Sequence, residues 1–373
     1  MSETRRRRLR RLWIAGLLTL LLQCAAMAWA TDKETNNFLT AGRRAFAEGN
    51  YKQAEDLIRQ AATESSLANT SESAQVLILS DLASVLQSAG KFDEAEPFFD
   101  RAIAIARSHT SDDKRRLPIL LGNLGKLYLQ TDRMERAENS LREALQLGKK
   151  HLAAEPQYLA DFHNHLGILD LRAGKRKQAE REFKAALALV ENDTSNDRDI
   201  RMVSIMSSLA TLYYMDTKWS LAEQTLLRSI ETVERVRGRS HPSLCAILDD
   251  LGFLYLKQDK LEQAEAVLRR NLAIRELVFG TDSAYTASTA ASLANLLTAK
   301  GEYEEARKLF TDALNTQERV LGRVPEVAST LDQFANMLRR IHNDALAGDL
   351  AARAESIRLE SEYTVSLKHL QRE

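Results

Sequence analysis

The residues closest to metal or acid–base chemistry are two histidines on either side of one asparagine, His163, Asn164 and His165. Imidazole nitrogens are common ligands of zinc and other transition metals, so this triplet is the first candidate metal site. Side chains two positions apart on a helix point in different directions and cannot easily hold one ion together. No CxxC, HExxH, Walker or GxGxxG pattern accompanies the triplet. We therefore expect no metal, with one histidine packed and the other exposed.

Two further reactive side chains lie in structural contexts. Cys245 stands beside Ala246 within an apolar stripe, which favours a packed thiol over a nucleophile. His241 precedes Pro242 where a helix is expected to begin, and proline suits the first turn of a helix. No serine, histidine and aspartate share a recognisable strand–turn–helix setting. The sequence therefore predicts a protein that is not an enzyme and that uses no cofactor.

The composition favours packed helices. The chain has 373 residues, with only 15 Gly and 5 Pro, while apolar types make up 44% and aromatic types 6%. This balance argues against low-complexity, collagen-like and disulfide-rich proteins. Lys plus Arg number 52, and Asp plus Glu also number 52, so the formal charge is zero. A neutral chain is not expected to bind nucleic acid.

The first thirty residues have the composition of an export signal. Six arginines between Arg5 and Arg11 precede an apolar run over residues 12–30, which ends in Ala28, Trp29 and Ala30. Small residues at positions 28 and 30 fit the cleavage site of a signal peptidase, so the mature chain is expected to begin at Thr31. The mature protein would then be periplasmic or extracellular.

Other interpretations of this segment stay open. As a helix, the apolar run would span roughly 28 Å, close to the thickness of a bilayer core, so residues 12–30 could instead remain as an inner-membrane anchor. Arg5 and Arg6 partly match a twin-arginine signal, and Gln23 with Cys24 partly matches a lipoprotein box. In each version the basic end stays in the cytoplasm and the remainder crosses the membrane.

A period of about 42 residues runs through the rest of the chain. One small residue recurs at gaps of 41 to 43 positions. We call these the register alanines: Ala54, Ala95, Ala137, Ala179, Ala222, Ala264, Ala306 and Ala347. Twelve positions before each stands Gly or Ala, such as Gly125, and four positions after it usually lies a large apolar residue, such as Leu141. A repeat of this kind indicates one structural unit used many times.

Each repeat is predicted to be a helical hairpin. Two apolar stripes with i, i+3, i+4, i+7 spacing flank a polar turn, such as the one at residues 89–91. The small residues let two helices approach closely, and the large residues fill the grooves around them. One hairpin cannot bury both of its stripes, so the hairpins must stack on their neighbours. The predicted fold is therefore an all-α solenoid of about eight hairpins.

This pattern resembles the tetratricopeptide repeat. One of its clearest copies has Leu124, Gly125, Tyr128, Ala137 and Leu141, and another lies over residues 251–268. The period of about 42 is longer than the common 34 and looks like the kinesin-light-chain form. The resemblance covers about residues 35–358 and implies a right-handed superhelix. It is weakly specific for function, because one fold hosts many activities.

The resemblance also implies which side chains a partner would touch, because the first helix of each hairpin lines the concave surface in this family. Exposed positions follow by counting from the small residue on each first helix. The residues expected to contact a partner are Arg43, Phe46, Lys126, Leu129, Asn164, Leu171, Tyr214, Phe253, Leu256, Asn295, Asn336 and Arg339. The middle of this set is apolar and aromatic and its ends are more polar, which suits an extended peptide.

These observations predict three segments and two alternative functions. Residues 1–30 form the signal or anchor, residues 31–358 the solenoid, and residues 359–373 a polar cap or tail. The leading hypothesis is an exported, non-catalytic adaptor that binds a protein or an extended peptide of unknown identity. The membrane would be contacted only through residues 1–30, if these are retained. The alternative is a structural or assembly subunit of a cell-envelope complex.

Overall fold

The computed structural model describes residues 35–67, 71–108, 114–191 and 198–370, and the regular elements in these ranges are all helices. The predicted signal or anchor over residues 1–30 lies outside the described residues. Within them, no helix is both long enough and apolar enough to cross a bilayer. The chain divides into two compact units, Met1–Asp193 (unit 1) and Thr194–Glu373 (unit 2).

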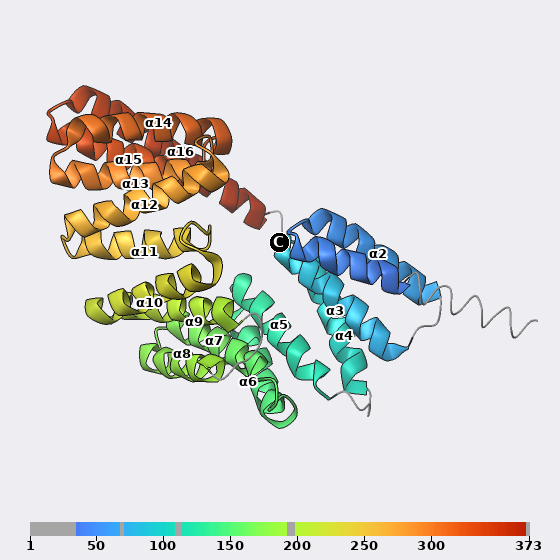
Figure 1. The fold of residues 1–373 in the computed structure, drawn as a ribbon. Helices are drawn as coiled ribbons and strands as arrows, with labels where there is room; N and C mark the ends of the chain where they lie inside the picture. Colours follow the sequence, from blue (N-terminus) through green and yellow to red (C-terminus); the bar gives the residue numbers. More distant parts are fainter. Residues whose placement is uncertain (1–34, 68–70, 109–113, 192–197, 371–373) are drawn as a thin grey trace, which may run out of the picture. The chain divides into compact units, whose positions relative to one another are not determined.

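Unit 1 is built of helical hairpins (Figure 1). Its first described helix covers residues 35–47. The helices that follow are α2 (Tyr51–Leu67), α3 (Glu72–Ser88), α4 (Phe92–Ser108), α5 (Arg116–Gln130), α6 (Met134–His151), α7 (Pro156–Arg172) and α8 (Arg176–Glu191). Helices that are consecutive in sequence pack together, and α5 also contacts α7. Each hairpin therefore packs on the next, as the repeat predicts.

Unit 2 repeats this arrangement (Figure 1). Its helices are α9 (Arg198–Met215), α10 (Trp219–Arg237), α11 (Leu244–Lys257), α12 (Leu261–Phe279), α13 (Ala284–Lys300), α14 (Tyr303–Leu321), α15 (Pro325–Arg340) and α16 (Asp344–Leu370). Here α13 contacts α15 in addition to its own partner α14. Residues 359–370, predicted as part of a polar cap or tail, continue α16.

The register alanines lie at the closest approach of the paired helices. All eight have at most 1% of their surface exposed. The small residue twelve positions before each register alanine lies on the first helix of the hairpin. Where it is glycine, it faces the large apolar side chain four positions after that alanine, on the second helix. A Cβ added to Gly167 would lie 2.5 Å from Cε1 of Phe183, and one added to Gly125 would lie 2.6 Å from Cγ of Leu141. The predicted helical pairing is confirmed at these contacts.

Each hairpin turn contains one residue in the left-handed region of backbone space, at the same spacing as the register alanines. These residues are Gly49, Gly90, Asp132, Gly174, Thr217, Asp259, Gly301 and His342. The amide that follows donates to a carbonyl five residues earlier, as Lys218 N does to Tyr213 O at 2.9 Å. This bond satisfies a carbonyl at the end of the first helix and reverses the chain. Glycine is favoured here because a Cβ strains the left-handed conformation.

Candidate partner-binding site

Two residues predicted to contact a partner, Tyr214 and Phe253, lie together in unit 2. Tyr214 belongs to the last turn of α9 and Phe253 to α11, and their ring centroids are 5.4 Å apart with the planes tilted by 44°. Trp219, the first residue of α10, meets Tyr214 edge-on at 5.3 Å. Phe253 is 49% exposed. Such ring pairs stabilise each other by about 0.5–1.5 kcal/mol beyond their burial, so the three rings support one another.

The two rings border a cavity of about 190 Å³ between α9, α10 and α11. The other residues that line it are Ala210, Thr211, Ala222, Leu226, Asp250 and Leu254. Ala210 and Ala222 are the small residues of this repeat, so their short side chains leave the space open. An engineered apolar cavity of about 150 Å³ accepts benzene, which indicates that this one has room for one large side chain.

Asp250 is the carboxylate at this mainly apolar cavity. Among the described residues, none forms an ion pair or hydrogen bond with its side chain. The side chain reaches solvent, but the protein around it removes part of its hydration, which raises the pKa of Asp250. Sequence reasoning did not single out Asp250. Its signal was its position three residues before Phe253, which puts both side chains on one face of α11.

The remaining predicted contact residues of unit 2 lie on three first helices. Leu256 of α11 is half-buried, and Asn295 of α13 is exposed. Asn336 and Arg339 are exposed on α15, where Nη1 of Arg339 donates to Oδ1 of Asn336 at 2.9 Å. These side chains supply amide and guanidinium groups, which can bond the main chain of a peptide.

In unit 1, two predicted contact residues are buried, contrary to the expectation that both are exposed. Leu129 is 4% exposed and Asn164 is 7% exposed. The physical reason is that α5 and α7 pack against each other, so side chains between them are covered. Nη1 of Arg172 on α7 donates to the carbonyl of Leu129 on α5 at 2.7 Å, which joins the two helices.

The other predicted contact residues of unit 1 keep some exposed surface. Lys126 is exposed, and Leu171 is half-buried. Phe46 is half-buried, with its ring 5.8 Å from that of Tyr51. Arg43 is exposed, and its Nε lies 2.6 Å from Oδ2 of Asp81. A cavity of about 350 Å³ with a mixed polar and apolar lining lies beside this ion pair, and its polar residues include Ser80, Asp81, Ser84, Arg116, Asn123 and Tyr158.

The two histidines of the triplet are both partly buried, whereas one was expected to be exposed. Nδ1 of His163 lies 2.6 Å from Oε2 of Glu182 on α8. His165 is desolvated, which lowers its pKa to about 4, and the charge of Lys126 adds to the shift. Among the described residues, no three side chains are grouped as ligands for a metal ion.

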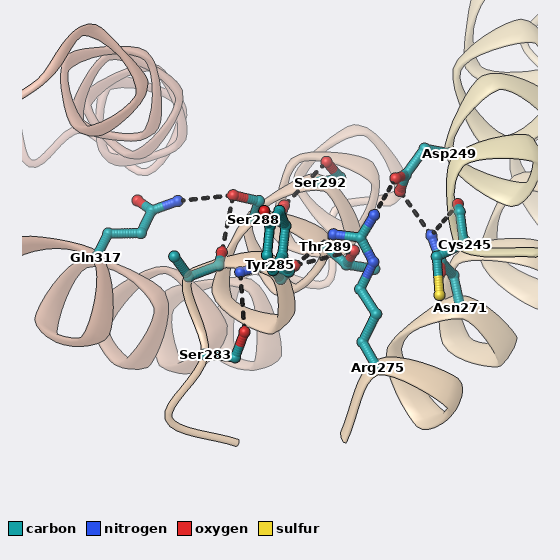
Figure 2. Close-up of polar contacts among 11 residues, drawn as sticks. Cys245, Asp249, Asn271, Arg275, Ser283, Tyr285, Ser288, Thr289, Ser292 and Gln317 are labelled. Atoms are coloured by element: carbon teal, nitrogen blue, oxygen red, sulfur yellow. Dashed lines mark hydrogen bonds and ion pairs between the residues drawn. The ribbon is translucent and has the colours of Figure 1, made fainter. Parts of the chain in front are cut away.

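A polar network holds α11 in place against α12 and α13 (Figure 2). Arg275 of α12 forms an ion pair with Asp249 of α11, and its Nη1 donates to the carbonyl of Tyr285 at 2.5 Å. Nδ2 of Asn271 donates to Oδ1 of Asp249 at 2.6 Å and to the carbonyl of Cys245 at 3.1 Å. Burial raises the pKa of Asp249 to about 6, although Arg275 opposes the shift. The network fixes the helix that carries Asp250 and Phe253.

Burial also decides the chemistry of the one described cysteine. Cys245 is 5% exposed, and desolvation raises the pKa of its thiol. The thiol is therefore packed, as the sequence predicts, and it is poor in the reactive thiolate form.

Four stretches of the chain match the tetratricopeptide repeat family, residues 73–150, 201–277, 243–319 and 285–360, and together they cover more than half of it. The chain belongs to the tetratricopeptide repeat (TPR) family. A TPR fold is a scaffold for protein–protein interaction, and no enzyme family is indicated. No curated protein matches the TPR chain.

Solved structures show the same fold at low identity. BtubC (BKLC) from P. vanneervenii is 19% identical, with a TM-score of 0.55 over 61% of this TPR chain and 92% of its own. The quorum sensor NprR from B. thuringiensis is 12% identical, with a TM-score of 0.64 over 87% of each chain. A Podosopora anserina protein that is described under the name kinesin light chain is 17% identical, with a TM-score of 0.49 over 56% of this chain and 98% of its own.

Proposed function

We propose that this TPR protein is a non-catalytic adaptor that binds a protein or an extended peptide along the exposed side chains of its first helices. The observation that carries the proposal is the cavity beside Tyr214 and Phe253, where two rings border an apolar space with room for one side chain. Recognition sites combine a mainly apolar hollow with few polar groups, and large side chains inserted into such hollows dominate affinity. The cavity has both features.

A double substitution, Tyr214→Ala with Phe253→Ala, tests the proposal. The variant loses both ring walls of the cavity, so we expect it to capture its partners at least tenfold less well in a pull-down from extracts of the source organism. Circular dichroism should show unchanged helical content. A matched control, Tyr285→Ala with Tyr363→Ala, removes two exposed rings away from the cavity and should leave capture intact. Undiminished capture by the first variant would contradict the proposal.

We also propose that the adaptor acts outside the cytoplasm. The support is the arginine cluster of residues 5–11 followed by the apolar run to Ala30. The intact mass of the protein isolated from cell fractions tests this. A chain that begins at Thr31 in the periplasm or medium indicates cleavage, and a membrane-bound chain that keeps residues 1–30 indicates an anchor. A full-length chain in the cytoplasm would contradict export.

One observation favours the alternative, a structural subunit of an envelope complex. Among the described residues, all exposed large hydrophobic side chains except Tyr51 lie in unit 2. Several occur near the ends of its second helices: Val236, Leu277, Val278, Phe279, Val320 and Leu321. Exposed apolar clusters often mark protein interfaces. If this role is correct, Leu277→Asp should shift the protein to a smaller species in native electrophoresis of solubilised envelopes.

A further inference from the structure

We propose that the cavity beside Tyr214 and Phe253 binds a basic side chain, a lysine or an arginine of the captured peptide. The inference rests on the proposed function and names the chemistry of the residue that the site selects. It follows from three properties of the cavity: its apolar walls, its aromatic rings and the single carboxylate of Asp250.

The walls suit the long stem of a basic residue. Leu226, Leu254 and the two alanines offer apolar surface over a space of about 190 Å³. Lysine and arginine carry three or four methylene groups, which pack on such surface while the charged end stays near polar groups. A short polar residue would leave the space empty, with no partner atoms for its walls.

The rings favour a cation at this place. The faces of Tyr214 and Phe253 carry negative partial charge, and a cation within about 6 Å of such a ring is attracted to it. The chain already uses one of these rings in this way, because Nζ of Lys257 lies 5.3 Å from the centroid of Phe253. The ring of Tyr214 has no such cation among the described residues, so a ligand's cation can approach it from the cavity.

The charge of Asp250 distinguishes a basic residue from an apolar one. Other aspartates on the first helices have cationic partners: Asp81 pairs with Arg43, Asp249 with Arg275, and Asp332 with Arg358. Asp250 has no such partner among the described residues. A purely apolar side chain would desolvate this carboxylate further without compensation, which is unfavourable. An acidic side chain would be repelled by it.

A positional peptide array tests the inference directly. The probes are dodecapeptides whose central residue is fixed as each amino acid in turn while the other positions are randomised. The full chain should bind the arginine and lysine sets about tenfold more strongly than the alanine set, because a charge-assisted bond to a carboxylate has about that effect. Asp250→Asn should reduce this ratio several-fold, to what the apolar walls and the rings contribute without the carboxylate. Asp312→Asn, an equal charge change at an exposed position of α14, should leave it unchanged.

The outcomes separate this inference from the proposed function. If peptides bind and the aromatic, aliphatic or acidic sets are preferred, the basic side chain is the wrong ligand, while the adaptor function stands. If the preference for arginine and lysine is undiminished by Asp250→Asn, the carboxylate assignment is overturned. If no peptide set binds, and partner capture is also insensitive to Tyr214→Ala with Phe253→Ala, both proposals are overturned. Loss of the basic preference in 0.5 M salt would support the electrostatic contact.

Discussion

His165 is a partly buried titratable side chain whose surroundings disfavour its charged form. No described residue forms a hydrogen bond with its buried Nδ1, and desolvation lowers its pKa to about 4. The ordinary value, near 6.5, applies to the unfolded chain. Between these values the unfolded state binds more protons than the folded state, so the free energy of unfolding falls as the pH is lowered from about 6.5 to about 4.

We expect His165→Gln to weaken this acid sensitivity, because glutamine does not titrate. The wild-type chain should lose on the order of 2–3 kcal/mol more stability than the variant between pH 7.5 and pH 4.5. Urea unfolding at both values measures the difference. Parallel behaviour of wild type and His165→Gln would show that His165 is protonated in the folded state.

Thr217 is a second residue whose setting has a measurable consequence. It is β-branched and has a φ of 56°, at a turn position where four of the other described repeats have glycine. A side chain in this region costs about 1–2 kcal/mol, which glycine avoids. Glycine loses more backbone entropy on folding, and this loss offsets part of the gain. Thr217→Gly should therefore raise the free energy of unfolding by about 0.5–1 kcal/mol in urea titrations. The reverse change, Gly174→Thr, should lower it, and a stabilising effect there would contradict the assignment of strain.

At the scale of the helices, the small residues set how closely each pair can approach. Gly167 of α7 faces the fully buried ring of Phe183 on α8, which has no free space to move into. Gly348 of α16 has no atom within 4 Å of the place where a Cβ would stand. The same substitution at these two positions should therefore have opposite effects.

We expect Gly167→Ala to destabilise the chain by about 1–3 kcal/mol, since the added methyl overpacks the helix crossing. Gly348→Ala should stabilise it by about 0.5–1 kcal/mol, since alanine is the better helix former. Chemical unfolding of both variants measures the effects. Equal changes would mean that the close approach of α7 and α8 does not depend on the glycine.

The helices were predictable because the spacing of small and large apolar residues along the sequence reflects how they pack. The residue three positions before each register alanine, such as Met134 or Tyr303, is the first residue of a second helix. The site was only partly predictable, because exposure depends on how neighbouring hairpins pack. Tyr214 and Phe253 meet as their register suggests, whereas Leu129 is covered by α7. The network at Asn271 needs three helices together, and no spacing rule reveals it.

At the scale of the whole molecule, the chain contains two compact units, each with its own buried alanines and aromatic side chains. In repeat proteins, each hairpin gains stability chiefly from its immediate neighbours. We therefore expect a destabilising change in one unit to be felt mainly in that unit. Amide hydrogen exchange followed by mass spectrometry can locate the effect along the chain.

Gly167→Ala lies in unit 1, so it should speed exchange in α5 to α8 several-fold and leave α11 to α16 near the wild-type rates. The corresponding change in unit 2 is Gly252→Ala, since Gly252 faces Leu268. It should speed exchange in unit 2 and leave α5 to α8 near the wild-type rates. Faster exchange throughout the chain in either variant would show that the two units unfold as one.

The ion pairs Asp249–Arg275 and Asp332–Arg358 occupy equivalent positions two repeats apart. A deletion of α12 to α15 would join α11 directly to α16 and bring Asp249 opposite Arg358. Both charges would then keep an oppositely charged partner at the new junction. Evolution or protein engineering could thus lengthen or shorten unit 2 by whole repeats, because the ion pairs between its helices can re-form across the new junction.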